Sequence, residues 1–202
     1  MKKIRKAVIP AAGFGTRFLP QTKAMPKEML PIVDKPVIQY VVEELVDAGI
    51  TDIILVTGYH KRTIEDHFDA ANLDLIENLR QGGEKKRALL EQVEQISKMA
   101  NFVYVRQKGP YGNGTPLINV KHLIGDEPFI YTWSDDFILA TPSRFKQMLA
   151  VYEKYRTSVM GSIRAKTDED YARYGFAGGK VIEDGIIDVD TLIEKPGKDN
   201  AP

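Results

Sequence analysis

The segment after the first apolar run of the chain combines small residues with positive charges. It reads Ala11-Ala12-Gly13-Phe14-Gly15-Thr16-Arg17 and continues to Lys27-Glu28. Glycines let a ligand approach the backbone closely, and successive N–H groups in a tight turn form a concavity that binds anions. Arg17 and Lys27, with Lys23 as a third candidate, supply cations that would neutralise a phosphate chain. The segment therefore predicts a phosphate-binding loop, and the alternative is a solvated basic loop whose glycines only serve turns.

Two familiar phosphate-binding motifs do not describe this segment. A dinucleotide fingerprint requires a third glycine where Phe18 stands, and a P-loop requires Gly-Lys-Ser/Thr, which this segment lacks. The carboxylate of Glu28 would repel phosphates, so we expect it to accept hydrogen bonds from a base or from the backbone of the loop.

Polar residues also follow two later apolar runs. Asp135 and Asp136 come after the run 128–133, and paired carboxylates at the end of a strand suit a hard cation such as Mg²⁺. Gln107 ends another run and is followed by Gly112. An amide offers the donor and the acceptor that the edge of an imide base requires. The alternative for Asp135 and Asp136 is a simple aspartate turn. The alternative for Gln107 and Gly112 is the end of a strand followed by a glycine turn.

The elements that position these residues alternate between strand and helix. The apolar runs predict strands at 6–10, 52–57, 101–106, 128–133 and 158–164. Helical spacing predicts helices at 36–49, 63–68, 72–100 and 143–155, the last with a serine cap. In the charged segment 72–100 the expected inward face consists of Leu89, Leu90, Val93 and Ile96. This alternation indicates an α/β fold with a Rossmann-like, mostly parallel sheet flanked by helices.

The connection from Ala11 to Lys35 is long for such a fold. It holds three prolines, two glycines and no clear period. Long loops inside compact domains are usually functional, and ligands of open α/β sheets bind outside the carboxyl ends of the strands. We therefore expect the active site at this loop.

Composition excludes several classes of protein. The chain has 202 residues, of which 43% are hydrophobic and 28% charged, and Lys plus Arg equals Asp plus Glu at 28 each. This balance argues against a chain-wide basic surface for nucleic acid. The chain has no cysteine and no run of 18 apolar residues, so we expect no disulfide, no thiol chemistry and no membrane span. The broken N-terminal apolar run is unlike a secretory signal, which predicts a cytoplasmic protein.

Two motifs identify a family. Gly-Phe-Gly-Thr-Arg-Phe-Leu-Pro at 13–20 and Pro-Lys-Glu-Met-Leu-Pro-Ile-Val-Asp-Lys-Pro at 26–36, with the segments 38–44 and 64–69, resemble the sugar-1-phosphate nucleotidyltransferases. Within that family the bacterial-type UTP–glucose-1-phosphate uridylyltransferase branch is the most similar. The resemblance is dense from residue 6 to 69 and patchier from 102 to 196.

The resemblance implies a fold and a reaction. It implies one nucleotidyltransferase domain over 1–202, with a nucleotide-binding part at 1–140 and a small β-rich sugar-phosphate-binding part at 141–202. It also implies that UTP and glucose 1-phosphate react with Mg²⁺ to give UDP-glucose and pyrophosphate, by in-line attack on the α-phosphorus. Family members generally continue well beyond the position of Pro202, so the chain is expected to be C-terminally short. A homo-oligomer remains open.

The same resemblance assigns roles to residues. The implied catalytic residues are Arg17, Lys27 and Lys195. The implied nucleotide-binding residues are Ala11, Ala12, Gly13, Gly15, Thr16, Arg17, Lys27, Glu28, Gln107 and Gly112. The implied sugar-phosphate-binding residues are Gly175, Glu194 and Lys195, and the implied metal ligand is Asp135.

The chain departs from the family pattern at two places. Gly112-Asn113-Gly114-Thr115-Pro116 stands where the family usually has Gly-Leu-Gly-His-Ala, and Trp133-Ser134-Asp135-Asp136 stands where it usually has Leu-Pro-Asp-Asp. Two alternatives are therefore kept. One is transfer of a thymidylyl or other nucleotidyl group, and the other is a catalytically silent domain that binds nucleotide sugars.

Overall fold

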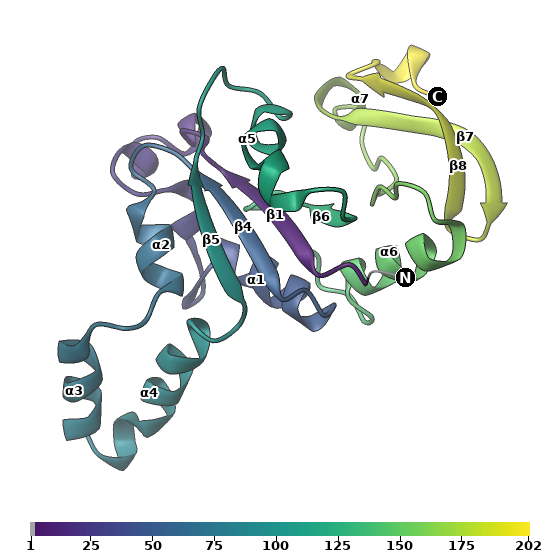
Figure 1. Cartoon of the computed structure of the whole chain (residues 1–202). Helices are drawn as coiled ribbons and strands as arrows, with labels where there is room; N and C mark the ends of the chain where they lie inside the picture. Colours follow the sequence, from purple (N-terminus) through teal and green to yellow (C-terminus); the bar gives the residue numbers. More distant parts are fainter. Residues whose placement is uncertain (1–2) are drawn as a thin grey trace. The chain divides into compact units, whose positions relative to one another are not determined.

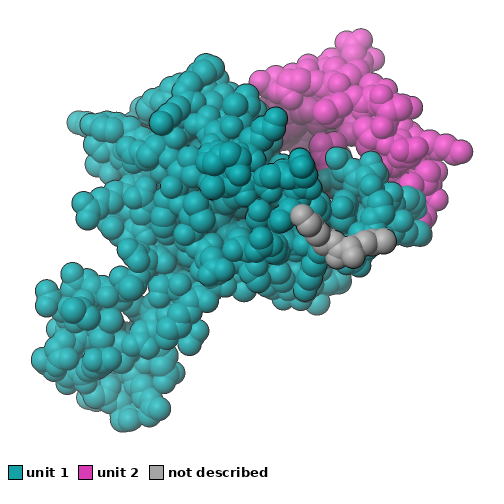
Figure 2. Space-filling view, in the orientation of Figure 1, with its two compact units in different colours: residues 1–159 teal, residues 160–202 magenta. Residues whose placement is uncertain are grey.

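The computed structural model describes residues 3–202. The chain forms two compact units, residues 1–159 and residues 160–202 (Figure 2), and each unit is described by itself. The functional division predicted at residues 140 and 141 remains a prediction.

Unit 1 is built on a parallel sheet of four of the five predicted strands. Its strand order is β5 (Asn101–Arg106), β4 (Asp52–Thr57), β1 (Lys6–Ala11) and β6 (Phe129–Tyr131) (Figure 1). All three strand pairs are parallel. β6 is shorter than the expected run 128–133 because its pairing with β1 ends at Tyr131. The α/β fold class is confirmed.

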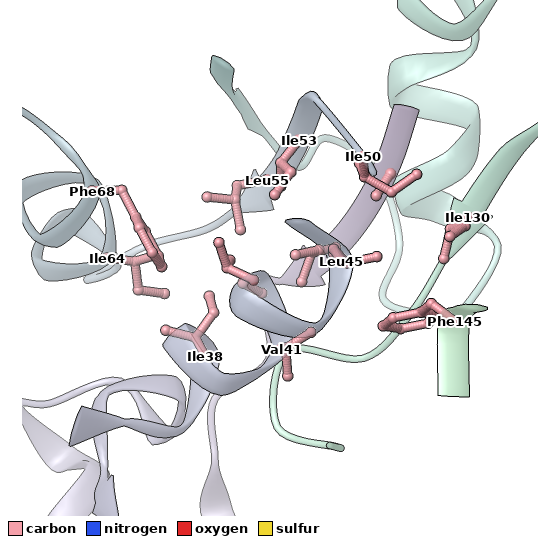
Figure 3. Close-up of a cluster of buried hydrophobic side chains, with 14 of the residues drawn as sticks. Ile38, Val41, Leu45, Ile50, Ile53, Leu55, Ile64, Phe68, Ile130 and Phe145 are labelled. Carbon is pink, nitrogen blue, oxygen red and sulfur yellow. The ribbon is translucent and has the colours of Figure 1, made fainter. Parts of the chain in front are cut away.

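Helices cover both faces of this sheet because successive side chains of a strand point to opposite faces. On one face, α1 (Val37–Asp47), α2 (Arg62–Phe68) and α6 (Arg144–Tyr155) pack against the strands. Figure 3 shows this cluster, in which Leu45 of α1 and Phe68 of α2 are fully buried. On the other face, α5 (Thr115–Ile124) packs against Val8, Ile54 and Val56.

The expected helix boundaries hold where prolines and glycines mark them. α1 follows Pro36 and ends before Gly49, whose φ of 88° lies in the left-handed region that favours glycine. Ser143 occupies the N-cap position of α6, but its hydroxyl makes no capping hydrogen bond to that helix. Among residues 3–202, the structure contains no helix with the length and apolar character needed to cross a bilayer.

The charged segment 72–100 differs in detail from its prediction. It forms two helices, α3 (Leu73–Gln81) and α4 (Glu84–Ile96), because Gly82 and Gly83 break the helical pattern. The two helices pack on each other and form a hairpin that projects from the sheet in Figure 1. Leu89 is 51% exposed, so its expected place on the inward face was wrong, whereas Ile96 packs against the core.

The fifth strand, expected at 158–164, does not form. Met160 and Ile163 are 54% and 80% exposed, and the segment has no strand partner within the described part of the chain. A strand requires a neighbour for its backbone N–H and C=O groups, and this segment crosses the boundary between the two units instead.

Unit 2 contains the small β-rich part that was predicted. After the short helix α7 (Asp170–Arg173), β7 (Gly175–Glu183) and β8 (Ile186–Glu194) form an antiparallel pair. A 3₁₀ turn, η4 (Lys198–Asn200), follows β8.

The long connection after β1 is folded by short-range turns rather than by regular secondary structure. It contains three 3₁₀ turns, η1 (Thr16–Phe18), η2 (Gln21–Lys23) and η3 (Lys27–Met29). The two-residue strands β2 (Pro31–Ile32) and β3 (Lys35–Pro36) then lead into α1. These turns explain why the segment shows no period in the sequence.

Candidate active site

The predicted site residues of unit 1 follow the carboxyl ends of neighbouring parallel strands. The last residues of three strands are aligned in register, with Ala11 of β1 beside Thr57 of β4 and Thr57 beside Arg106 of β5. We call the long connection after β1, residues 11–35, the first loop. The first loop, Gly58 and Gln107 therefore leave the sheet at the same edge. Ligands of open α/β sheets bind at this edge.

The glycine-containing start of the first loop, residues 11–17, is called the glycine loop. It packs against the turn η3, which carries Lys27. Gly15 has a φ of 67°, and a Cβ placed on it would lie 3.1 Å from the Cβ of Lys27 and 3.2 Å from Cγ2 of Thr22. The Thr22 hydroxyl donates a hydrogen bond to the Gly15 carbonyl at 2.6 Å, and the Phe18 N–H donates to the same oxygen at 3.0 Å. Both the left-handed backbone and the close packing require glycine at position 15.

Lys27 meets the predicted metal ligand. Its Nζ lies 2.7 Å from Oδ2 of Asp135, and their side chains are 25% and 33% exposed. Lys27 belongs to η3 and Asp135 follows β6, so the fold brings together two residues that are 108 positions apart. The predicted phosphate-binding cation and the predicted metal-binding carboxylate thus lie in contact at the edge where the strands end.

The other cations of the first loop are open to solvent. Arg17 is exposed and makes no ion pair within residues 3–202. Lys23 is also exposed, at the end of η2. A Cβ added to Gly13 would meet nothing within 4 Å, so the backbone there is accessible to a ligand.

Glu28 lies beneath this loop rather than on its surface. Its side chain is fully buried, and its Oε2 accepts a hydrogen bond of 2.6 Å from Nζ of Lys61, which is also buried. Oε1 of Glu28 has no hydrogen-bond partner among the described residues. Because Lys61 directly precedes α2, the pair ties η3 to the segment after β4. The predicted contact of Glu28 with a nucleotide stays a prediction.

The first loop also touches the segment after β4 through its backbone. A Cβ placed on Gly58 would lie 3.2 Å from the carbonyl oxygen of Ala12 and 3.3 Å from its Cα. A larger residue at position 58 would push against the start of the glycine loop, so Gly58 permits the close approach of the two loops.

Gln107 and Gly112 flank a loop that is held at both of its ends. The Gln107 N–H donates to the Thr57 carbonyl at 2.8 Å, which fixes the end of β5. The amide of Asn119 on α5 accepts from the Lys108 N–H at 2.6 Å and donates to its carbonyl at 3.0 Å. The Tyr131 hydroxyl donates to the Asn113 carbonyl at 2.7 Å. A Cβ added to Gly112 would meet nothing within 4 Å, so space is open at the tip.

The two neighbouring aspartates have different surroundings. Asp136 is engaged by Arg144, which donates from one guanidinium nitrogen to its Oδ2 at 3.3 Å and from the other to Glu44 at 3.1 Å. Burial raises the pKa of Glu44 above its usual range, and the neighbouring Arg144 acts against that rise. Asp135 pairs only with Lys27 among the described residues. Residues 3–202 contain no cluster of three or more His, Cys, Asp or Glu that could hold a metal ion by itself.

The predicted sugar-phosphate residues lie together in unit 2. Gly175 and Glu194 face each other across the β7–β8 pair, and a Cβ on Gly175 would lie 3.0 Å from Oε2 of Glu194. Lys195 follows β8 with a φ of 50°, and its N–H donates to the Tyr174 carbonyl at 3.0 Å. Its Nζ lies 3.6 Å from Oε1 of Glu194, and both side chains are largely exposed. The charged ends are therefore available to a ligand.

Comparison with known proteins decides the family. The sequence model of the family described as nucleotidyl transferase matches residues 6–202, which is nearly the whole chain. This chain belongs to the nucleotidyl transferase family.

Two named relatives of this chain come from Bacillus subtilis (strain 168). This chain is 50% identical over 202 residues to a UTP–glucose-1-phosphate uridylyltransferase, and the match covers all of this chain and 68% of the relative. It is 48% identical over 202 residues to the UTP–glucose-1-phosphate uridylyltransferase YngB, covering all of this chain and 66% of that relative. The chain therefore spans about two thirds of the length of these curated relatives.

A solved structure gives the same result for the fold. The crystal structure of a UDP-glucose pyrophosphorylase complexed with UDP-glucose matches this chain with a TM-score of 0.84 and 40% identity. The match covers 99% of this chain and 72% of that one. The fold expected from the sequence resemblance is thereby confirmed.

Several residues that build the candidate site were missed in the sequence analysis. Three residues were not singled out. Lys61 pairs with Glu28, and the Thr22 hydroxyl donates a hydrogen bond to the Gly15 carbonyl. Gly58 allows the backbone of Ala12 to lie close to it. Only Gly58 carries a signal, because a glycine directly after a strand often marks a close backbone approach.

Proposed function

We propose that this chain transfers the uridylyl group of UTP to glucose 1-phosphate, giving UDP-glucose and pyrophosphate. The observation that carries the proposal is the contact of Lys27 with Asp135 beside the glycine loop. The contact brings the predicted phosphate-binding cation and the predicted metal-binding carboxylate together at the edge where ligands of such sheets bind. The similarity of the full chain to proteins named UTP–glucose-1-phosphate uridylyltransferase supports UTP as the nucleotide and glucose 1-phosphate as the sugar phosphate.

The nucleotide would occupy the edge of the sheet in unit 1. Its phosphates would lie on the backbone of the first loop, from Ala11 to Thr16, and would be neutralised by Arg17 and Lys27. Its uracil would meet the amide of Gln107 and the open backbone at Gly112. The accessible Gly13 and the exposed Arg17 support this placement, because an anion needs free N–H donors and an unpaired cation.

Mg²⁺ fits the residues present when substrate phosphates complete its coordination. Magnesium is commonly bound by one or two carboxylates together with phosphates and water. Asp135 has one oxygen engaged by Lys27 and is one-third exposed, so its other oxygen is open to a cation carried by the nucleotide. Bound there, the ion would supply positive charge for the phosphates, and Asp135 would hold it.

Glucose 1-phosphate would be received by unit 2. Glu194 would accept hydrogen bonds from the sugar hydroxyls, Lys195 would neutralise the sugar phosphate, and Gly175 would leave room for the sugar beside the backbone. The largely exposed charges of Glu194 and Lys195 support this assignment.

The chemistry requires no covalent enzyme intermediate. An oxygen of the sugar phosphate attacks the α-phosphorus, a new P–O bond forms, and the bond to the bridging oxygen breaks as pyrophosphate leaves in line. The chain would contribute position and charge neutralisation through backbone amides, Arg17, Lys27 and Lys195. The oligomeric state and a cytoplasmic location remain predictions from the sequence.

A pyrophosphate-release assay with UTP, glucose 1-phosphate and Mg²⁺ tests the proposal. Release that depends on both substrates would support it. Binding of UDP-glucose without release would instead indicate a silent nucleotide-sugar-binding domain. Parallel reactions with dTTP and with other sugar 1-phosphates separate uridylyl from thymidylyl transfer, and faster release with dTTP would contradict the assigned base.

A further inference from the structure

Two exposed aromatic rings meet above the predicted nucleotide edge. The ring centroids of Phe14 and Tyr111 lie 5.0 Å apart with an interplanar angle of 50°. Phe14 is 61% exposed and Tyr111 is 66% exposed. Each ring therefore keeps a large accessible surface in addition to the contact that they share. We refer to Phe14 and Tyr111 as the aromatic pair.

The aromatic pair joins two loops that follow different strands. Phe14 belongs to the first loop after β1, and Tyr111 belongs to the loop after β5. Each ring directly follows or precedes a glycine with open space around it, since a Cβ at Gly13 or Gly112 would meet nothing within 4 Å. The rings thus stand beside room that a flat ligand can enter.

Tyr111 is exposed but its loop is anchored. Asn119 binds both backbone groups of Lys108, and the Tyr131 hydroxyl binds the Asn113 carbonyl. The loop is therefore fixed on each side of the tyrosine, and ordering Tyr111 for a ligand costs less entropy than ordering a free loop.

We propose that the aromatic pair forms a platform on which the base of the nucleotide stacks. The proposal rests on the function proposed above and adds a source of affinity for the base. Gln107 would select the base by hydrogen bonds, whereas the aromatic pair would hold any flat base. Because the two rings are inclined by 50°, the base would stack on the face of one ring and pack against the other at an angle. Tyr111 directly precedes the segment 112–116, where the chain departs from the usual family pattern.

Binding measurements separate a contact with the base from a contact with the phosphates. Isothermal titration calorimetry would compare UTP with inorganic tripolyphosphate, each with Mg²⁺, on the full chain. Phe14→Ala and Tyr111→Ala are each expected to weaken UTP binding about tenfold, within the range known for base stacking on aromatic residues. Both variants should bind tripolyphosphate as the unchanged chain does.

Two further variants serve as controls. Tyr111→Phe keeps the ring and should retain the UTP affinity of the unchanged chain. Tyr59→Ala removes another exposed tyrosine, which is 72% exposed and packs on His60, and it should also leave UTP affinity unchanged. Thermal unfolding of each variant would show that the fold is intact.

Three outcomes would overturn the proposal. If both alanine variants bind UTP as tightly as the unchanged chain does, the base does not stack on these rings. If the variants lose affinity for tripolyphosphate as well as for UTP, the rings affect binding of the phosphates rather than of the base. An unchanged chain that binds no UTP would refute both this platform and the proposed function. Weakened UTP binding by the alanine variants of a chain that releases no pyrophosphate would support the platform and refute only the proposed reaction.

Discussion

The Nζ atom of Lys27 lies 2.7 Å from Oδ2 of Asp135 and links the first loop to the segment after β6. Any phosphate that binds Lys27 must compete with this carboxylate. A nucleotide bound as proposed would therefore meet a lysine that is already paired with a carboxylate at the edge of the sheet. The contact also makes the two residues interdependent, so their variants are best interpreted as a pair.

Lys27→Ala is expected to lower the rate of pyrophosphate release by about 10² to 10³, the usual effect of removing one group that stabilises charge in a transition state. Thermal stability should change little, because partly exposed ion pairs contribute only ~0–1 kcal/mol. Lys85→Ala, at an exposed position on α4, is the matched control. An unchanged rate in the Lys27 variant would refute its catalytic role.

Arg17→Ala is expected to raise the KM for UTP about tenfold or more, because a close cation interacts with a phosphate by about 4 kcal/mol before desolvation costs. Arg17→Lys keeps the charge but loses the two parallel donors of the guanidinium, so it should recover only part of the affinity. Steady-state kinetics at several UTP concentrations measure both effects. Arg80→Ala, on the exposed surface of α3, should behave like the unchanged chain.

Asp135→Asn is expected to raise the Mg²⁺ concentration required for half-maximal activity, since an amide is a weaker ligand for a hard cation than a carboxylate. Asp136→Asn is the matched control. That residue is engaged by Arg144, so its variant should keep the Mg²⁺ requirement. The same Mg²⁺ dependence in all three proteins would contradict the assignment of Asp135.

The buried pair of Glu28 and Lys61 should be sensitive to loss of one partner. Lys61→Met leaves a carboxylate uncompensated at a site where Glu28 has no exposed surface, and it should lower the free energy of unfolding by about 3–5 kcal/mol. The double variant Glu28→Leu/Lys61→Met removes both charges and should regain much of that stability. Urea unfolding monitored by circular dichroism measures the difference. Equal stability of the unchanged chain and the single variant would contradict this account.

His67 should make stability depend on pH. Burial lowers its pKa below the ordinary value of 6.5, and its Nε2 lies 2.9 Å from Oε1 of Gln39. The unfolded chain then binds a proton more readily than the folded chain, so this contribution to stability is present above pH 6.5. It is lost as the pH falls from 6.5 through the folded pKa. His67→Gln should flatten this part of a plot of unfolding free energy against pH, and an unchanged slope would count against the assignment.

The sheet could be predicted well because its strands are short apolar runs between turn residues. The same reasoning failed at 158–164, where the apolar residues lack a strand partner in the described structure and Ile163 stays exposed. It also placed Leu89 on an inward face that the α3–α4 hairpin does not bury. In both cases burial depends on which elements are adjacent in space, and local periodicity does not contain that information.

The candidate site, like the fold, could be predicted only where the signal lies in neighbouring residues of the sequence. The glycine loop could be predicted because its residues are contiguous, and the fold then brings Lys27 to Asp135. Lys61 could not be predicted because it is 33 positions from Glu28. A lysine in a polar segment is normally exposed, so no local signal marked its burial.

The hairpin of α3 and α4 has a practical consequence. Its glycine turn at Gly82 and Gly83 projects from the sheet in Figure 1, and exposed turns of this kind tolerate inserted sequence. A peptide tag or a fluorescent domain spliced between these two glycines would leave the carboxyl ends of the strands undisturbed. The hairpin thus offers a handle for immobilising or labelling the protein while its chemistry is observed.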